Sequence, residues 1–215
     1  MIAENLSQID VTANAETVAF TTLILEEKEL EVVGDAIMSY VHLRNINLSK
    51  NQFTSLNELA ALPDLLQLVA SENQIANISF LSQDTNANLQ VLKLPQNKIK
   101  SLPPLTPIYL RHININENEL ESCHDFTGHP NLQILELRKN KLINCDGLGN
   151  MPCLKELYLA ENPIVSISQL HTLPNLKKLH LRATEIEVFD LVPDLPALEY
   201  LNLRETKIAA LAELK

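Results

Sequence analysis

The fold of this chain is decided by the stretch LKELYLAENPI, which occupies residues 154–164. The stretch follows the pattern L-x-x-L-x-L-x-x-N-x-I/L, and close copies of it recur through most of the 215 residues. Successive copies open at intervals of about 22 residues, on the leucines Leu43, Leu65, Leu89, Leu110, Leu132, Leu154, Leu176 and Leu198. A nearly fixed period in the twenties is typical of a solenoid, in which each repeat packs only against its neighbours.

The first half of each copy predicts a short strand. Residues two apart share a face of a strand, so Leu157 and Leu159 point into the core while Tyr158 points outward. Apolar residues then continue at every third position, as at Ile164 and Ile167, and this spacing favours a short 3₁₀ segment over a full helix. The sequence therefore predicts an α/β solenoid of the leucine-rich-repeat class. We expect a right-handed superhelix of eight or nine repeats of about 22 residues each, with a parallel concave sheet and short 3₁₀ or irregular convex segments.

An asparagine closes the strand pattern in six of the copies. These residues are Asn51, Asn73, Asn97, Asn118, Asn140 and Asn162. Because an amide side chain can bond to the backbone of its own turn and of a neighbouring repeat, we expect the six to form a structural ladder. Thr184 and Thr206 take this position in the last two copies, where we expect the ladder to be weaker.

The pattern divides the chain into an N-terminal segment and one repeat domain. A degenerate first repeat can be placed on Phe20, Leu23, Leu25 and Leu30. We therefore expect residues 1–19 to cover the open end of the first repeat and residues 20–215 to form the repeat domain, without a C-terminal cap. The last repeat, which includes Leu211 and Leu214, would expose apolar surface, and we expect a partner protein to cover that end.

Composition and charge restrict the class of partner. A formal net charge of −10 argues against nucleic acid and against an anionic membrane surface. No apolar run approaches the roughly 18 residues that a membrane span needs, and the first residues lack the order of a signal peptide. Three cysteines, with no C-x-x-C pair, favour a reducing, cytoplasmic compartment.

The chain carries no recognisable catalytic, cofactor-binding or metal-binding motif. Phosphate-binding and hydrolase motifs are absent, and four glycines are too few for a phosphate-cradling loop. Cys123 and Cys145 share a repeat position and could lie side by side near His124 and His129. Their spacing fits zinc poorly, so we expect two small buried core residues. We predict no enzyme activity, no cofactor and no metal.

The outward strand positions of the later repeats supply a candidate protein-binding surface. Tyr and Arg concentrate binding energy at protein interfaces. The candidates at these positions are Arg138, Tyr158, His180, Arg182, Tyr200 and Arg204. The early repeats show small uncharged groups instead, such as Asn45 and Gln67. A mixed polar ladder without a partner is the alternative interpretation.

Several stretches also resemble a known family. The nearly fixed period with short convex segments resembles the SDS22-like class of leucine-rich repeats, which is typified by a phosphatase regulator. SYVHLR at residues 39–44, NLSKN at 47–51, LKELYLAEN at 154–162, LHLR at 179–182 and YLNLRE at 200–205 resemble the leucine-rich repeat-containing protein 23 family. Members of that family are components of ciliary and flagellar axonemes, and the resemblance covers roughly residues 20–215.

The resemblance implies a non-enzymatic scaffold of the axonemal cytoskeleton. The family's place is the third radial spoke, so the implied partners are radial spoke or other axonemal proteins. The alternative is an SDS22-like phosphatase-regulatory protein, which would hold a catalytic subunit on its concave face. The small, uncharged groups of the early repeats count against that alternative.

Overall fold

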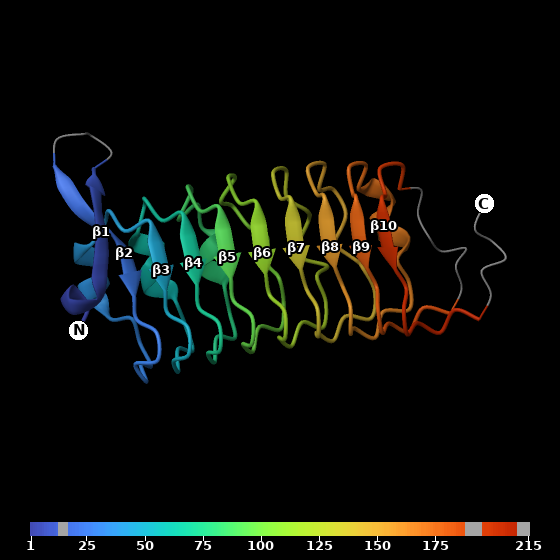
Figure 1. Cartoon of the computed structure of the whole chain (residues 1–215), viewed down its shortest axis with the longest axis horizontal. Coiled ribbons are helices and arrows are strands. Elements are labelled where there is room, and N and C mark those ends of the chain that lie inside the picture. The colour runs from blue at the N-terminus through green and yellow to red at the C-terminus, as the bar shows by residue number, and fades with distance from the viewer. Residues whose placement is uncertain (13–16, 188–194, 210–215) are drawn as a thin grey trace.

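A computed structural model describes residues 1–12, 17–187 and 195–209. Within them the chain forms one ten-stranded sheet whose strands follow the order of the sequence (Figure 1). The strands are β1 (Leu6–Val11), β2 (Val18–Ile24), β3 (Asn45–Asn47), β4 (Gln67–Val69), β5 (Val91–Lys93), β6 (His112–Asn114), β7 (Ile134–Glu136), β8 (Glu156–Tyr158), β9 (Lys178–His180) and β10 (Tyr200–Asn202). From β2 to β10 every neighbouring pair is parallel. This architecture confirms the predicted leucine-rich-repeat solenoid.

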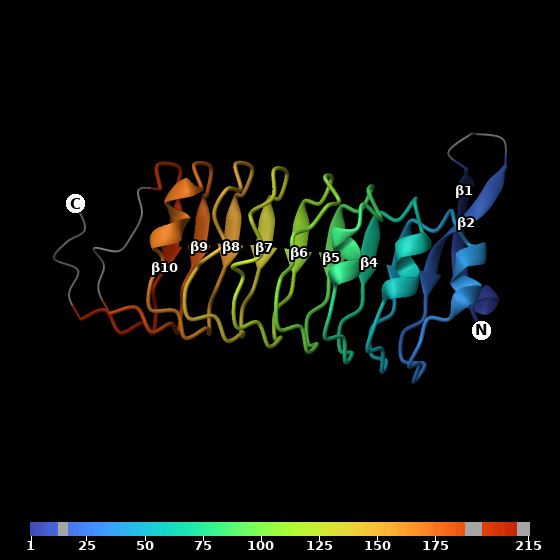
Figure 2. The same cartoon turned by 180° about the vertical axis from the view of Figure 1, so that it is seen from behind.

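Short 3₁₀ helices and irregular segments run behind the sheet (Figure 2). After η1 (Ala3–Asn5), the helices in the described residues are η2 (Asp35–Ser39), η3 (Asn57–Ala61), η4 (Ser79–Ser82) and η5 (Ser168–Thr172). The spacing of leucines explains η3, because Leu59 N–H donates to the Leu56 carbonyl at 3.0 Å and Leu62 N–H to the Leu59 carbonyl at 3.1 Å. Apolar residues three apart thus turn inward together on a 3₁₀ turn.

The alternation of the strands decides which side chains form the core. Leu135, Leu157 and Leu179 are fully buried at the centres of β7, β8 and β9, whereas Glu156 and Tyr158 on either side of Leu157 remain partly exposed. We call the side of the sheet that carries these outward side chains the sheet face. It corresponds to the concave face that the sequence predicts.

The asparagine ladder joins each repeat to the one before it. The Asn140 amide group donates to three carbonyls, those of Ile115 at 2.9 Å, Leu137 at 3.0 Å and Arg138 at 3.3 Å. Its Oδ1 accepts from the Leu120 N–H at 2.9 Å. The same pattern of donation across a repeat boundary recurs at Asn51, Asn73, Asn97, Asn118 and Asn162.

The two threonines in the same position make fewer bonds. Thr184 donates through Oγ1 to the Leu181 carbonyl at 2.8 Å, and Thr206 donates to the Leu203 carbonyl at 2.9 Å. Both bonds stay inside one repeat, so neither threonine reproduces the amide's link to the preceding repeat. The backbone just before the ladder position is left-handed throughout, as at Lys139 (φ 53°) and Glu161 (φ 59°).

The longest repeat absorbs its extra residues behind the sheet. This repeat runs from Leu65 to the next opening leucine, Leu89, yet Gln67 still pairs with Val91 and Val69 with Lys93. The insertion is held in place by buried Asn86, whose amide donates to two carbonyls of the preceding repeat at 2.9 Å each. The insertion therefore leaves the register of the sheet face intact.

The N-terminal end of the sheet is an antiparallel hairpin of β1 and β2, which the repeat pattern did not predict. Leu23 and Leu25 are buried as expected, but Phe20 is 42% exposed. Phe20 and Leu23 are three positions apart on one strand, so they point to opposite faces, and only Leu23 reaches the core. The expectation that residues 1–19 cap the first repeat stays a prediction.

The other end of the sheet is less completely buried than its middle. Leu198, Leu201, Leu203 and Ile208 are partly buried, whereas their equivalents in the middle repeats are fully buried. Leu211 and Leu214 lie outside the described residues.

One buried histidine, His129, is expected to make the stability of the solenoid depend on pH. His129 is 2% exposed, bonds through Nε2 to the Pro107 carbonyl at 3.0 Å and accepts through Nδ1 from the Asn131 N–H. Burial lowers the pKa of His129 below its ordinary value. Below about pH 6.5 the unfolded chain therefore binds a proton that the folded chain resists, and acid favours unfolding.

We expect His129→Met to lose less stability than the parent between pH 7.5 and pH 5.5. Urea unfolding at the two pH values measures the difference, and His171→Gln, at an exposed histidine, is the matched control. An equal loss in the parent and in His129→Met would contradict the assignment.

Candidate functional site on the sheet face

The outward side chains of β7 to β10 form three rows that run across the strands. The register places Ile134, Glu156, Lys178 and Tyr200 in the first row, and Glu136, Tyr158, His180 and Asn202 in the second. The third row lies just past the strands and holds Arg138, Ala160, Arg182 and Arg204. We call this third row the arginine row. The rows bring all six sequence-predicted residues onto one part of the sheet face.

Aromatic rings pack against each other from the second row to the first. The rings of Tyr158 and His180 are stacked with centroids 4.7 Å apart, and His180 lies 5.0 Å from Tyr200 at an interplanar angle of 32°. Burial lowers the pKa of His180, which keeps its ring uncharged near neutral pH. Burial and a hydrogen bond to Glu156 raise the pKa of the Tyr158 hydroxyl. The stack is therefore an uncharged, ordered surface.

Two of the three arginines are already paired within the chain. Arg138 donates through Nε to Glu161 Oε1 at 2.7 Å, and its Nη2 forms an ion pair with the same oxygen at 2.5 Å. Arg182 donates through Nη2 to both carboxylate oxygens of Glu205, at 2.8 and 3.0 Å. Arg204 is exposed, and within the described residues no ion pair forms with its side chain.

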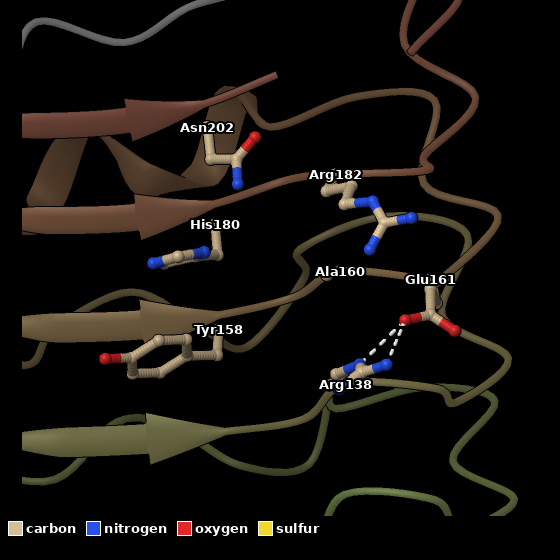
Figure 3. A pocket seen from close by; sticks show the side chains of 7 residues that line it. All are labelled: Arg138, Tyr158, Ala160, Glu161, His180, Arg182 and Asn202. Atoms are coloured by element: carbon tan, nitrogen blue, oxygen red, sulfur yellow. Dashed lines mark hydrogen bonds and ion pairs between the residues drawn. The ribbon is translucent and has the colours of Figure 1, made fainter. Parts of the chain in front are cut away.

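A cavity of about 300 Å³ opens between these groups. It is lined by Arg138, Tyr158, Ala160, Glu161, His180, Arg182 and Asn202. Figure 3 shows the guanidinium groups of Arg138 and Arg182 on either side of Ala160, with Tyr158 and His180 forming the wall on the strand side. Tyr200 and Arg204, which the sequence also put forward, lie outside the cavity lining.

Glu161 and Glu205 were not singled out from the sequence. The sequence nevertheless contains a pattern that could have identified them, since each glutamate follows an arginine of the arginine row by 23 residues. That spacing places a residue just before the ladder position of the next repeat. Arg138 and Arg182 are therefore each paired with a carboxylate from the next repeat.

A second polar cluster lies toward the centre of the sheet face. His112 Nε2 is 2.7 Å from Glu136 Oε1, and Asn116 donates to Glu136 Oε2 at 3.0 Å. The hydrogen bond from His112 is the main reason that the pKa of Glu136 is lowered. This carboxylate is satisfied within the chain, and its charge is stabilised by its neighbours.

The N-terminal half of the sheet face has a different chemistry. A smaller cavity of about 190 Å³ is lined by uncharged residues of β2, β3 and β4, among them Ile24, Asn45, Gln67 and Val69. We call the outward side chains of β2 to β4, none of which is charged, the uncharged half of the sheet face, and those of β7 to β10, which include charged and aromatic groups, the charged half.

Two of the three cysteines, Cys123 and Cys145, are core residues, and Cys153 is exposed. Cys123 and Cys145 are buried, and burial raises the pKa of the Cys123 thiol to about 12, so it stays protonated. In the described part of the chain no three His, Cys, Asp or Glu side chains lie together as a metal site would require. No helix among the described residues has the length and apolar character to cross a bilayer.

Comparisons with known proteins agree with this architecture. A family model for leucine rich repeats (2 copies) matches residues 130–171. Leucine-rich repeat-containing protein 23 of Homo sapiens is 33% identical over 128 residues, which are 60% of this chain and 35% of that protein. Toll-like receptor 2 of Ovis aries is 28% identical over 120 residues, or 54% of this chain and 15% of the receptor. The crystal structure of internalin C2 from Listeria monocytogenes superposes with a TM-score of 0.75 at 25% identity, covering 86% of this chain and 80% of that one.

These relatives share repeats and differ in much else. The chain spans 35% and 40% of the length of leucine-rich repeat-containing protein 23 from human and from Bos taurus. Part of the identity is carried by the repeat consensus, since a Toll-like receptor shares it as well. The chain has a leucine-rich-repeat fold, and its sequence is similar to that of leucine-rich repeat-containing protein 23.

Proposed function

We propose that this protein is a non-enzymatic scaffold of the ciliary or flagellar axoneme, a component of the third radial spoke that binds other spoke or axonemal proteins. The observation that carries the proposal is the similarity to leucine-rich repeat-containing protein 23, with 33% identity over 128 residues. The geometry supports a binding role, because the sheet face presents ordered aromatic rings and arginines. Such groups concentrate binding energy at protein interfaces.

We place the main contact on the charged half of the sheet face. The stacked rings and the clamped arginines lose little conformational freedom when a partner binds, which favours affinity.

The double substitution Arg182→Glu/Arg204→Glu tests this placement. We expect it to reduce recovery of axonemal partners about tenfold or more, because like charges then face each other across the interface. The measurement is quantitative pull-down with the tagged chain from salt extracts of axonemes. Lys98→Glu/Lys100→Glu makes the same change of charge at exposed positions away from the sheet face and is the matched control.

Unchanged recovery with a folded double variant would move the contact to the convex side or the ends. Failure of the parent chain to recover any radial spoke protein would contradict the axonemal assignment itself. Recovery of a phosphatase catalytic subunit in place of spoke proteins would favour the SDS22-like alternative.

A further inference from the structure

Arg138 and Arg182 in the arginine row each form an ion pair with a glutamate, and the position between them has no such pair. In two repeats an arginine of the row is clamped by a glutamate 23 residues later, as Arg138 is by Glu161 and Arg182 is by Glu205. Between these two pairs, Ala160 stands in the row and Ala183, 23 residues later in the next repeat, stands at the position of the glutamate. Both members of this ion pair are thus replaced by alanine. The left-handed backbone is kept, with φ of 54° at Ala183 and 59° at Glu161 and Glu205.

The paired alanines leave a notch between two arginines. Ala160 is 8% exposed and forms part of the cavity lining, while the side chains of Arg138 and Arg182 on either side are 46% and 47% exposed. Neighbouring strands in a sheet lie about 4.8 Å apart, so the two arginines, two strands apart, are separated by about one residue's side chain. Figure 3 shows this opening above Ala160.

The notch is rich in hydrogen-bond donors. A guanidinium group carries five N–H donors on three nitrogens. Glu161 occupies Nε and Nη2 of Arg138, which leaves Nη1, and Glu205 occupies only Nη2 of Arg182, which leaves Nε and Nη1. Within the described residues, no hydrogen bond to these three nitrogens is formed. The Asn202 amide and the Glu161 carboxylate, which is paired with Arg138, also line the cavity.

We propose that this notch seats a glutamate or aspartate side chain from an acidic segment of a partner protein. The proposal rests on the proposed binding function and deepens it by naming the chemistry of the partner. A carboxylate is planar and accepts the parallel N–H bonds that arginine offers, so it matches both the size and the donors of the notch. The clamping glutamates hold the arginines in place before binding.

The charge of the rest of the molecule directs an acidic segment of a partner to this notch. The chain carries a net charge of −10, so an acidic segment is repelled by most of its surface. In the arginine row three arginines stand beside the two glutamates that pair with Arg138 and Arg182, so the row keeps an excess of positive charge, which exposed Arg204 supplies one strand beyond Arg182. Attraction at the arginine row and repulsion over the rest of the surface determine the orientation of a bound partner. They contribute more to this orientation than to the affinity.

Filling the notch tests the proposal with little risk to the fold. The double substitution Ala160→Arg/Ala183→Glu installs, between these two successive repeats, the same ion pair that Arg138 and Arg182 make on either side. The probe is a fluorescein-labelled hexaglutamate peptide, titrated at low ionic strength and followed by fluorescence anisotropy. We expect saturable binding to the parent and about tenfold weaker binding, or none, to the filled variant.

The matched control places the same pair elsewhere. Ser71→Arg/Gln96→Glu occupies the equivalent repeat positions in the uncharged half of the sheet face, where Gln96 has φ of 56°. We expect its affinity for hexaglutamate to equal that of the parent. Thermal unfolding checks that both variants fold. Should the filled variant fail to fold, Arg182→Gln removes donors without adding bulk and is expected to weaken binding severalfold.

Four results would overturn the proposal: no saturable binding of hexaglutamate, equal binding of hexaglutamine, equal binding by the filled variant, or tighter binding of a phosphoserine peptide. The test is independent of the axonemal assignment. Loss of hexaglutamate binding in the filled variant supports the notch even if no spoke protein is recovered from axonemes. Recovery of spoke proteins by the filled variant leaves the proposed function standing and moves the contact away from the notch.

Discussion

Replacing Leu157 with aspartate is expected to lower the free energy of unfolding by about 5 kcal/mol. Leu157 is fully buried at the centre of β8, between Leu135 of β7 and Leu179 of β9, with which it pairs in the sheet. A carboxylate at this point would lie among leucines and would either remain charged at high cost or take up a proton. Urea unfolding of the purified variant measures the loss.

The control for this substitution is the next residue. Tyr158→Ala removes a larger side chain, but Tyr158 lies on the sheet face and contacts His180 and Glu156 at the surface. We expect a loss below about 1 kcal/mol. Similar losses for Leu157→Asp and Tyr158→Ala would contradict the assignment of inward and outward positions.

The second large effect is expected at the asparagine ladder. Asn118→Ala and Asn140→Ala should each cost about 3 kcal/mol, because each leaves buried carbonyls and one buried N–H without a partner. Thr184→Ala should cost about 1 kcal/mol, since the threonine donates a single hydrogen bond within its own repeat. Chemical unfolding of the three variants under one set of conditions gives the comparison.

The order of these losses is the decisive result. Equal losses at Asn118, Asn140 and Thr184 would show that the amide's bonds to the preceding repeat contribute little. A loss at Asn140 well above that at Thr184 would show that the solenoid depends on links between repeats as well as on its leucine core. The last repeats, which have threonine at Thr184 and Thr206, would then be the first to open.

The sequence by itself determined the repeat architecture and the direction of its side chains. A period of about 22 residues with leucines two apart requires a short strand whose inner side is apolar, and only stacking on a neighbouring repeat can bury that side. The buried Leu157 and the outward Tyr158 follow from this rule. The asparagine ladder could also be predicted from the sequence, because a buried amide at a turn must form hydrogen bonds with the backbone.

The structure of the N-terminal end of the solenoid was less predictable from the repeat pattern than that of the middle. The antiparallel hairpin of β1 and β2 and the exposed Phe20 were not predicted, because the first repeat lacks the regular spacing that fixes register elsewhere. A strand at the edge has one neighbour only, so its pairing depends on local contacts such as the bond from Thr22 to Gln8. Repeat patterns carry no information about such contacts.

The candidate site shows the same division between sequence and structure. The sequence placed Tyr158, His180 and Arg182 on one face, since residues at the same repeat position stack across strands. Only the tertiary structure decided that Glu161 clamps Arg138 and that a notch remains over Ala160. The repeat position determines where the Cα atom of a residue lies in the solenoid. The direction of a long arginine side chain depends instead on which carboxylate of the next repeat lies within reach. That pairing comes from contacts between repeats, and it decides which donors stay free to meet a partner.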